Sequence, residues 1–231
     1  MKNQLKNLIK RREFVAFIGL AVICIAFCFG SSNFPTLYNA MNILRQASIN
    51  AILAVGMTFV IISGGIDLSV GSTVSLSGTI AAIMMVNMGM NVFMGVIGGL
   101  LVGLIIGALN GIIISRLSVP PIIATLGLMT IASGLALAFT GGRSVSGLAD
   151  GFDIFGRGNL GFLPVPVIII VLMYLIGHFT LQKTKFGSSV FGIGGNEEAA
   201  RLAGIPVKRT KVGVYMLLSL IHISEPTRRR G

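Results

Sequence analysis

The sequence predicts an all-α, polytopic membrane helix bundle, and three observations support this fold class. Of its 231 residues, 54% are hydrophobic and only 11% are charged, whereas a soluble domain carries about 25% charged residues. Apolar runs recur along the chain, and the mean hydropathy is +0.91. The net charge of +11 comes from basic residues grouped between those runs, as expected at the cytoplasmic face of a membrane. This grouping argues against nucleic acid as a partner.

Six stretches are long enough to cross a bilayer, which requires about 20 predominantly apolar residues. A seventh apolar stretch, from Val212 to Ile223, is too short to span. We therefore expect six complete transmembrane helices and a truncated seventh. The predicted spans are Phe14–Gly30, Ile43–Ile62, Val70–Met88, Val92–Ile114, Pro121–Phe139 and Phe162–Phe179.

The N-terminal segment MKNQLKNLIKRR is strongly basic and precedes the first apolar run. It could begin a signal peptide, but the run is long and no A-x-A cleavage site follows it. The preferred interpretation is a first membrane helix with its N-terminus in the cytoplasm. Counting spans then places the loop Thr140–Gly161 outside and the basic loop Leu181–Lys211 inside, in agreement with the charge bias.

In the fourth predicted span, a glycine recurs at every fourth residue. Small residues at this spacing let two helix backbones approach closely. We expect a packing seam inside one subunit, with a contact between two copies of the chain as the alternative. The seam consists of Gly95, Gly99, Gly103, Gly107 and Gly111.

Metal binding and catalysis are not predicted. Cys24 and Cys28 share one helix face without a nearby histidine or carboxylate, which favours a packing role. His178 has no partner in sequence that would suit an intramembrane enzyme. No G-x-x-x-x-G-K-[ST] motif is present, so a P-loop for ATP is not expected. We therefore predict no catalytic residue, no metal site and no cofactor bound by this chain.

The segment ISGGIDLSVGS places two glycines and Asp67 between two membrane-length runs. Irregular backbone at membrane depth survives only inside protein or beside water, and an acid there indicates a functional site. Asp67 could also cap the next helix, with Leu68–Gly71 as its first turn. Both interpretations are compatible, because capped, broken helices line transport sites.

The fifth predicted span carries hydroxyl groups at Thr125, Thr130 and Ser133. These side chains could line a path, or simply donate to the carbonyl group four residues earlier. The candidates for contact with a transported molecule are Ser63, Asp67, Ser69, Asn110, Thr125 and Thr130.

The segment GGNEEAARLAGIPVKRTK predicts a short helix in the basic loop. Asn196 is a favoured N-cap, and Glu197 and Glu198 complement the helix dipole. Gly204 is a natural residue to end the helix, and Pro206 prevents its continuation. A helix of about two turns is not stable alone, so it must dock on its own membrane domain or in a groove of a partner protein.

Several of these segments together resemble the permease family of bacterial ABC importers for ribose, galactose and xylose. Glu198-Ala199-Ala200 followed by Gly204 resembles the EAA-x-x-x-G coupling segment, and SGGIDLSVGS, AVGMTFVI and IIATLG match in order and spacing. The resemblance covers Asn33 to Leu218. It implies a fold of about ten membrane helices in the bacterial inner membrane.

The resemblance also implies partners for this chain. These are a cytoplasmic ATPase that uses the ATP, an extracytoplasmic sugar-binding protein, a second permease copy or paralogue, and membrane lipid. The coupling segment would transmit motion of the ATPase to the pore. It comprises Asn196, Glu197, Glu198, Ala199, Ala200, Arg201 and Gly204.

Two rival functions are open on the residues. A secondary transporter also uses broken helices and membrane acids, but it normally shows inverted repeats and more intramembrane charge. A non-transporting membrane scaffold is the other alternative. Binding of an ATPase to the short helix discriminates these readings from an importer subunit.

The C-terminal segment SLIHISEPTRRRG departs from the pattern of a membrane span. It resembles the translated read-through of a sequencing adapter. We therefore expect residues 1–218 to form the permease domain and residues 219–231 to be a non-native tail. As written, the chain is expected to be incomplete and not to transport.

Overall fold

The computed structural model describes residues 12–148, 152, 158–161 and 163–221. Most of these residues are helical, so the all-α prediction is confirmed, and the only strands among them are a pair of two residues each. The elements are α2 (Arg12–Gly30), α3 (Leu37–Ile62), α4 (Val70–Val86), α5 (Val92–Arg116), α6 (Pro121–Thr140), β1 (Asn159–Leu160), β2 (Leu163–Pro164), α8 (Val165–Lys183), α9 (Lys185–Gly195), α10 (Glu197–Leu202) and α11 (Val207–Ile221).

Within the described residues, four helices are long and apolar enough to cross a membrane, namely α3, α5, α6 and α8. The apolar part of α2, Phe17–Gly30, and helix α4 are shorter. These six helices lie where the sequence predicts the six spans. No group of three potential metal ligands occurs in this part of the chain.

The chain forms two compact units, Met1–Leu44 and Arg45–Gly231. In the first unit, the rings of Phe27 and Phe34 stack with centroids 5.4 Å apart. The Asn39 side chain donates to the Phe34 carbonyl over 3.0 Å. These contacts stabilise the turn between α2 and the start of α3.

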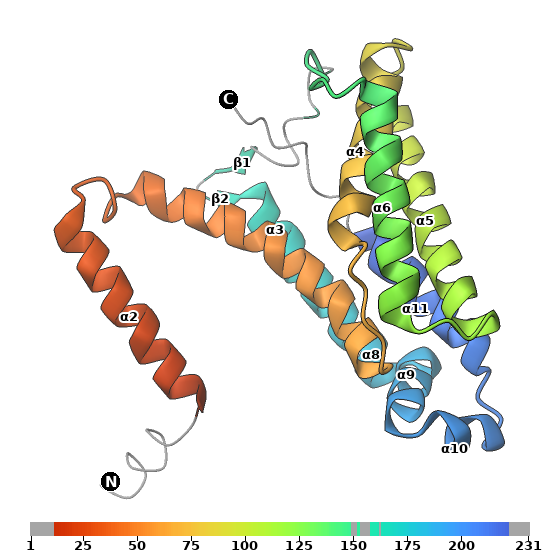
Figure 1. Cartoon of the computed structure of the whole chain (residues 1–231). Coiled ribbons are helices and arrows are strands. Elements are labelled where there is room, and N and C mark those ends of the chain that lie inside the picture. Colours follow the sequence, from red (N-terminus) through yellow and green to blue (C-terminus); the bar gives the residue numbers. More distant parts are fainter. Residues whose placement is uncertain (1–11, 149–151, 153–157, 162, 222–231) are drawn as a thin grey trace, which may run out of the picture. The chain divides into compact units, whose positions relative to one another are not determined.

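In the second unit, α4, α5, α6 and α11 run side by side (Figure 1). The glycines of α5 lie at the close contacts of this bundle. A Cβ added at Gly99 would lie 3.1 Å from the backbone carbonyl oxygen of Ser77 in α4. A Cβ added at Gly107 would lie 2.6 Å from the backbone carbonyl oxygen of Tyr215 in α11. The glycine column therefore packs inside one chain, against α4 at one end and α11 at the other.

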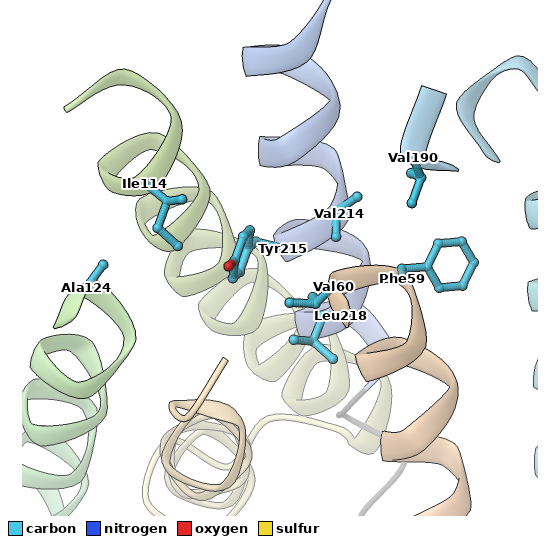
Figure 2. Close-up of a cluster of buried hydrophobic side chains, with 8 residues drawn as sticks. All are labelled: Phe59, Val60, Ile114, Ala124, Val190, Val214, Tyr215 and Leu218. Carbon is cyan, nitrogen blue, oxygen red and sulfur yellow. The ribbon is translucent and has the colours of Figure 1, made fainter. Parts of the chain in front are cut away.

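Helix α11 also contacts α3 closely, at a glycine that the sequence pattern did not single out. A Cβ at Gly56 of α3 would lie 2.7 Å from Leu218 Cδ1. Figure 2 shows the core that results, with side chains from five helices. Its members are Phe59, Val60, Ile114, Ala124, Val190, Val214, Tyr215 and Leu218.

Two elements differ from the sequence prediction. Helix α11 begins at Val207, before the predicted Val212, because the helix after Pro206 includes the basic residues that precede its apolar run. Helix α9 was not predicted, since its glycines argue against a helix in isolation. Residues 219–221 continue α11, and the remainder of the predicted tail lies outside the described residues.

Candidate functional site

The break between α3 and α4, residues 63–69, begins with a glycine-terminated helix end. Gly64 has φ +79°, a left-handed conformation that glycine adopts without a Cβ clash. Its N–H donates to the Ile61 carbonyl and the Gly65 N–H donates to the Val60 carbonyl, over 3.0 and 2.9 Å. This pair of bonds is a Schellman motif, which satisfies carbonyl groups that would otherwise be unpaired at the end of α3.

Asp67 organises the other side of the break. One carboxylate oxygen accepts from the Ser69 N–H at 2.7 Å and from the Ser69 hydroxyl at 2.6 Å. Asp67 thus accepts from an N–H group at the entry to α4, as the capping interpretation expects, but the helix begins at Val70 with Ser69 as its N-cap and not at Leu68. The Ser69 hydroxyl is engaged by Asp67 and makes no cap bond itself.

Side chains from three other helices fix this break in place. Asn110 of α5 donates to the Ser69 hydroxyl over 2.8 Å. Thr125 of α6 accepts from the Leu68 N–H at 3.2 Å. The Tyr215 hydroxyl of α11 donates to the Ile66 carbonyl at 3.4 Å. The break is therefore an irregular segment whose Ser63, Asp67 and Ser69 side chains are buried, while Ile66 and Leu68 stay 44% exposed.

Four of the six candidate path residues thus gather in one cluster. Asp67, Ser69, Asn110 and Thr125 are each at most 5% exposed, so in this conformation they form a packed network. Within the described residues, the amide oxygen Oδ1 of Asn110 has no hydrogen-bond partner. We name this set of four side chains the polar cluster.

The hydroxyl groups of the other two candidates bond to carbonyl groups of their own helices. The Ser63 hydroxyl donates to the Val60 carbonyl over 2.8 Å. The Thr130 hydroxyl donates to the Leu126 carbonyl over 3.1 Å, the back-bonding that is common for hydroxyls in membrane helices. Thr125 makes the same kind of bond to Pro121, at 2.8 Å, in addition to its contact with the break.

The predicted short helix is present as α10, and its ends are formed as the sequence predicts. The Asn196 side chain accepts from the Ala199 N–H at 3.0 Å. Gly204 has φ +83°, and the N–H groups of Gly204 and Ile205 donate to the Arg201 and Ala200 carbonyls. Helix α10 therefore ends, like α3, in a Schellman motif.

The inner face of α10 packs on its own chain. Ala200 is buried with Ile193 and Val207, and Ile205 covers them. The outer face carries two ion pairs, Glu197 with Lys211 and Glu198 with Arg201. Docking on the membrane domain thus leaves the charged face of the helix outward.

Sequence reasoning missed two features beside α10. Leu202 is 81% exposed although it lies outside every candidate span. Helix α9 begins with Thr184, whose hydroxyl accepts from the Gly187 N–H at 3.1 Å. The spacing of Phe186, Val190 and Ile193, at i, i+4 and i+7, is the signal that could have predicted this helix.

Comparison with known proteins decides the family. A family model described as a branched-chain amino acid transport system, permease component, matches residues 39–221. The chain belongs to this permease family. The matched region contains both the polar cluster and α10, and the family resemblance inferred from the sequence motifs is confirmed.

Several relatives of this permease are named as sugar transport proteins. The ribose import permease protein RbsC of Bacillus subtilis is 45% identical over 89% of this chain and 64% of its own length. RbsC of Haemophilus influenzae is 39% identical over 93% and 68%. The L-arabinose transport system permease protein AraH of Escherichia coli is 37% identical over 90% and 63%.

This permease chain spans about two thirds of the length of these relatives. No solved structure matches it.

Proposed function

We propose that the chain is the membrane subunit of an ATP-driven importer for a monosaccharide of the ribose, arabinose or galactose type. The observation that carries this proposal is the permease family match across residues 39–221. The printed functions of the relatives, ribose import and L-arabinose transport, supply the substrate class. Xylose is a further candidate from the sequence motifs.

We place the chain in a bacterial inner membrane with its N-terminus in the cytoplasm. Four candidate spans support a multi-pass protein. The segment from Leu181 to Lys211 carries six Lys and Arg residues against two Glu, which favours the cytoplasmic side. Helix α10 then faces the cytoplasm.

The proposed partner at α10 is an ATPase, which uses the ATP, while this chain binds no cofactor. Helix α10 supports this role because its inner face is already docked and its outer face presents Leu202 between charged residues. In the proposed interface, Leu202 is the apolar side chain that the ATPase would remove from water. A sugar-binding protein outside, and a second permease copy or paralogue, complete the proposed importer.

For the path itself, we propose that the polar cluster positions the α3–α4 break beside the route of the sugar. Asp67, Ser69, Asn110 and Thr125 are committed to hydrogen bonds with one another or with the break. Ser63 and Thr130 stay candidates for contact with the sugar itself.

Co-purification tests the proposed partner. Leu202→Asp is expected to reduce the amount of ATPase recovered with the permease by at least about tenfold, because it places a charge in the apolar contact. Leu117→Asp is the matched control, since Leu117 is also 68% exposed and follows Arg116 on the proposed cytoplasmic side. Equal recovery with both variants would contradict the docking role of α10.

Uptake separates the proposed function from a secondary transporter. The gene, sequenced through and beyond codon 231, is expressed with its ATPase and binding protein in vesicles. Ribose uptake should require ATP inside the vesicle and persist when an ionophore removes the proton gradient. Uptake that follows the gradient and ignores ATP would favour a secondary transporter.

A further inference from the structure

The α9–α10 segment touches the α3–α4 break at one unusually close point. A Cβ added at Gly194 of α9 would collide with the carbonyl oxygen of Ile62 and lie 2.9 Å from its carbonyl carbon. Ile62 is the last residue of α3, next to the break. Only a residue without a side chain allows the α9 backbone this approach.

Helix α9 is anchored beside this point by a buried side chain. Val190 lies one turn before Gly194 on the same helix face and is 0% exposed. It packs into the core of Figure 2 with Phe59 and Val60 of α3 and Val214 of α11. Two successive turns of α9 therefore rest on the end of α3.

No flexible linker separates this contact from α10. Asn196 is both the C-cap of α9 and the N-cap of α10. Its N–H donates to the Gly192 carbonyl over 3.2 Å, and Ile193 shares a small core with Ala200 and Val207. A force on α10 is thus carried by packed backbone to Gly194.

Beyond Ile62, the chain enters the break, whose far side is held by other helices. Gly64 and Gly65 lack a Cβ and so have the widest range of backbone conformations in this segment, which lets the chain pivot here. Ile66 and Leu68 are bonded to α11 and α6. A displacement of α9 therefore acts on a short segment between a pivot and fixed anchors.

We infer that the Gly194–Ile62 contact passes movement of the α9–α10 segment to the α3–α4 break, with Gly194 as the positioning residue. This inference rests on the proposed function, because the movement originates in the ATPase bound to α10. The break, with its polar cluster, is the element that changes conformation when the ATPase does.

A reporter in the break tests this inference in the assembled importer. Cys24→Ser and Cys28→Ser remove the two native cysteines, and Ile66→Cys places a thiol at a side chain that is 44% exposed. The rate of its reaction with a maleimide is measured without nucleotide and with the ATPase trapped by vanadate. We expect the two rates to differ by at least about fivefold, the lower end of usual coupling between sites.

Gly194→Ala is expected to bring the ratio of the two rates close to one while the ATPase still co-purifies. Gly195→Ala is the matched control, because an added Cβ there meets nothing within 4 Å, and it should keep the parent ratio. Val190→Ala loosens α9 without inserting an atom and is expected to lower the ratio. If the Gly194→Ala permease does not assemble with the ATPase, the rate ratio of Val190→Ala tests the inference in its place.

Equal rates in the parent, or a parent-like ratio in Gly194→Ala or Val190→Ala, would overturn the inference. A parent that recovers no ATPase contradicts the proposed function instead. The two failures are therefore distinguishable in one set of samples.

Discussion

The ends of α3 and α10 are the same local structure in two different surroundings. Both are Schellman motifs with a left-handed glycine, Gly64 with φ +79° and Gly204 with φ +83°. In each, two N–H groups donate back to the last turn. The first is followed by the polar break inside the membrane unit, and the second ends the short helix that we place in the cytoplasm.

The two ends differ in where the neighbouring polar groups find their partners. After α3, the break depends on hydrogen bonds with α5, α6 and α11, from residues 40 or more positions away. Helix α10 uses its own Asn196 cap and ion pairs to Arg201 and Lys211. In water, a helix end needs only local partners, whereas at membrane depth every group must be satisfied inside the protein.

The largest effect is expected where a buried acceptor is removed. Asp67→Ala leaves the Ser69 N–H and hydroxyl without their acceptor. An unsatisfied buried donor costs about 1–3 kcal/mol, so we expect a loss of about 2–4 kcal/mol in the free energy of unfolding. Denaturation in mixed micelles, followed by circular dichroism, measures this loss.

Asp67→Asn is the matched variant for this prediction. Its amide oxygen keeps one acceptor for Ser69, so stability and sugar uptake should be lost less than with alanine. If asparagine is as damaging as alanine, the charge of Asp67 matters and not only its acceptor geometry.

Overpacking between α5 and α11 should come next. In Gly107→Ala, the new Cβ would lie 2.6 Å from the Tyr215 oxygen, a backbone atom that cannot move aside locally. Overpacking of a core costs about 1–3 kcal/mol, and we expect the upper half of this range. Gly127→Ala, with nothing within 4 Å, is the control in the same micelle assay and should not be destabilised.

The two Schellman glycines allow a direct comparison of the two regions. Gly64→Ala and Gly204→Ala both place a Cβ in a left-handed conformation, with no atom within 4 Å of either. Each should cost about 1–2 kcal/mol, and the two losses should agree. A much larger loss at Gly64 would mean that the tertiary hydrogen bonds around the break fail together with its turn.

The smallest effect is expected on the surface of α10. Glu198→Gln removes the ion pair with Arg201. The side chain of Glu198 is 63% exposed and that of Arg201 is 67% exposed. Solvent screening reduces such pairs to less than about 0.5 kcal/mol, so unfolding should be almost unchanged. A loss comparable with that of Asp67→Ala would show that α10 is held by charge and not by its apolar inner face.

Much of the fold could be predicted from the sequence. The apolar runs mark the membrane helices because a bilayer demands about 20 apolar residues. The caps of α10 were predictable because Asn196 and Gly204 act on their own helix. Helix α9 was missed, since its stability comes from Val190 and Gly194 resting on α3 and not from its glycine-rich composition.

The candidate site was predicted less completely, for a physical reason. Asp67, Asn110 and Thr125 were each singled out as polar residues in apolar runs, but nothing local indicates that Asn110 donates to Ser69. The start of α4 was predicted two residues early, at Leu68, whereas the helix begins at Val70. Hydrogen bonds between residues this far apart in the chain depend on how the helices pack.

By itself, the sequence determined which segments are membrane helices, where the chain breaks, and how α10 is capped, because these follow from composition and contacts within a few residues. The tertiary structure decided what the break is fixed to and where the glycines pack. It divided the Gly95–Gly111 column between α4 and α11 and brought Gly194 against Ile62. Those contacts join residues far apart in the chain, so they depend on how the helices approach one another.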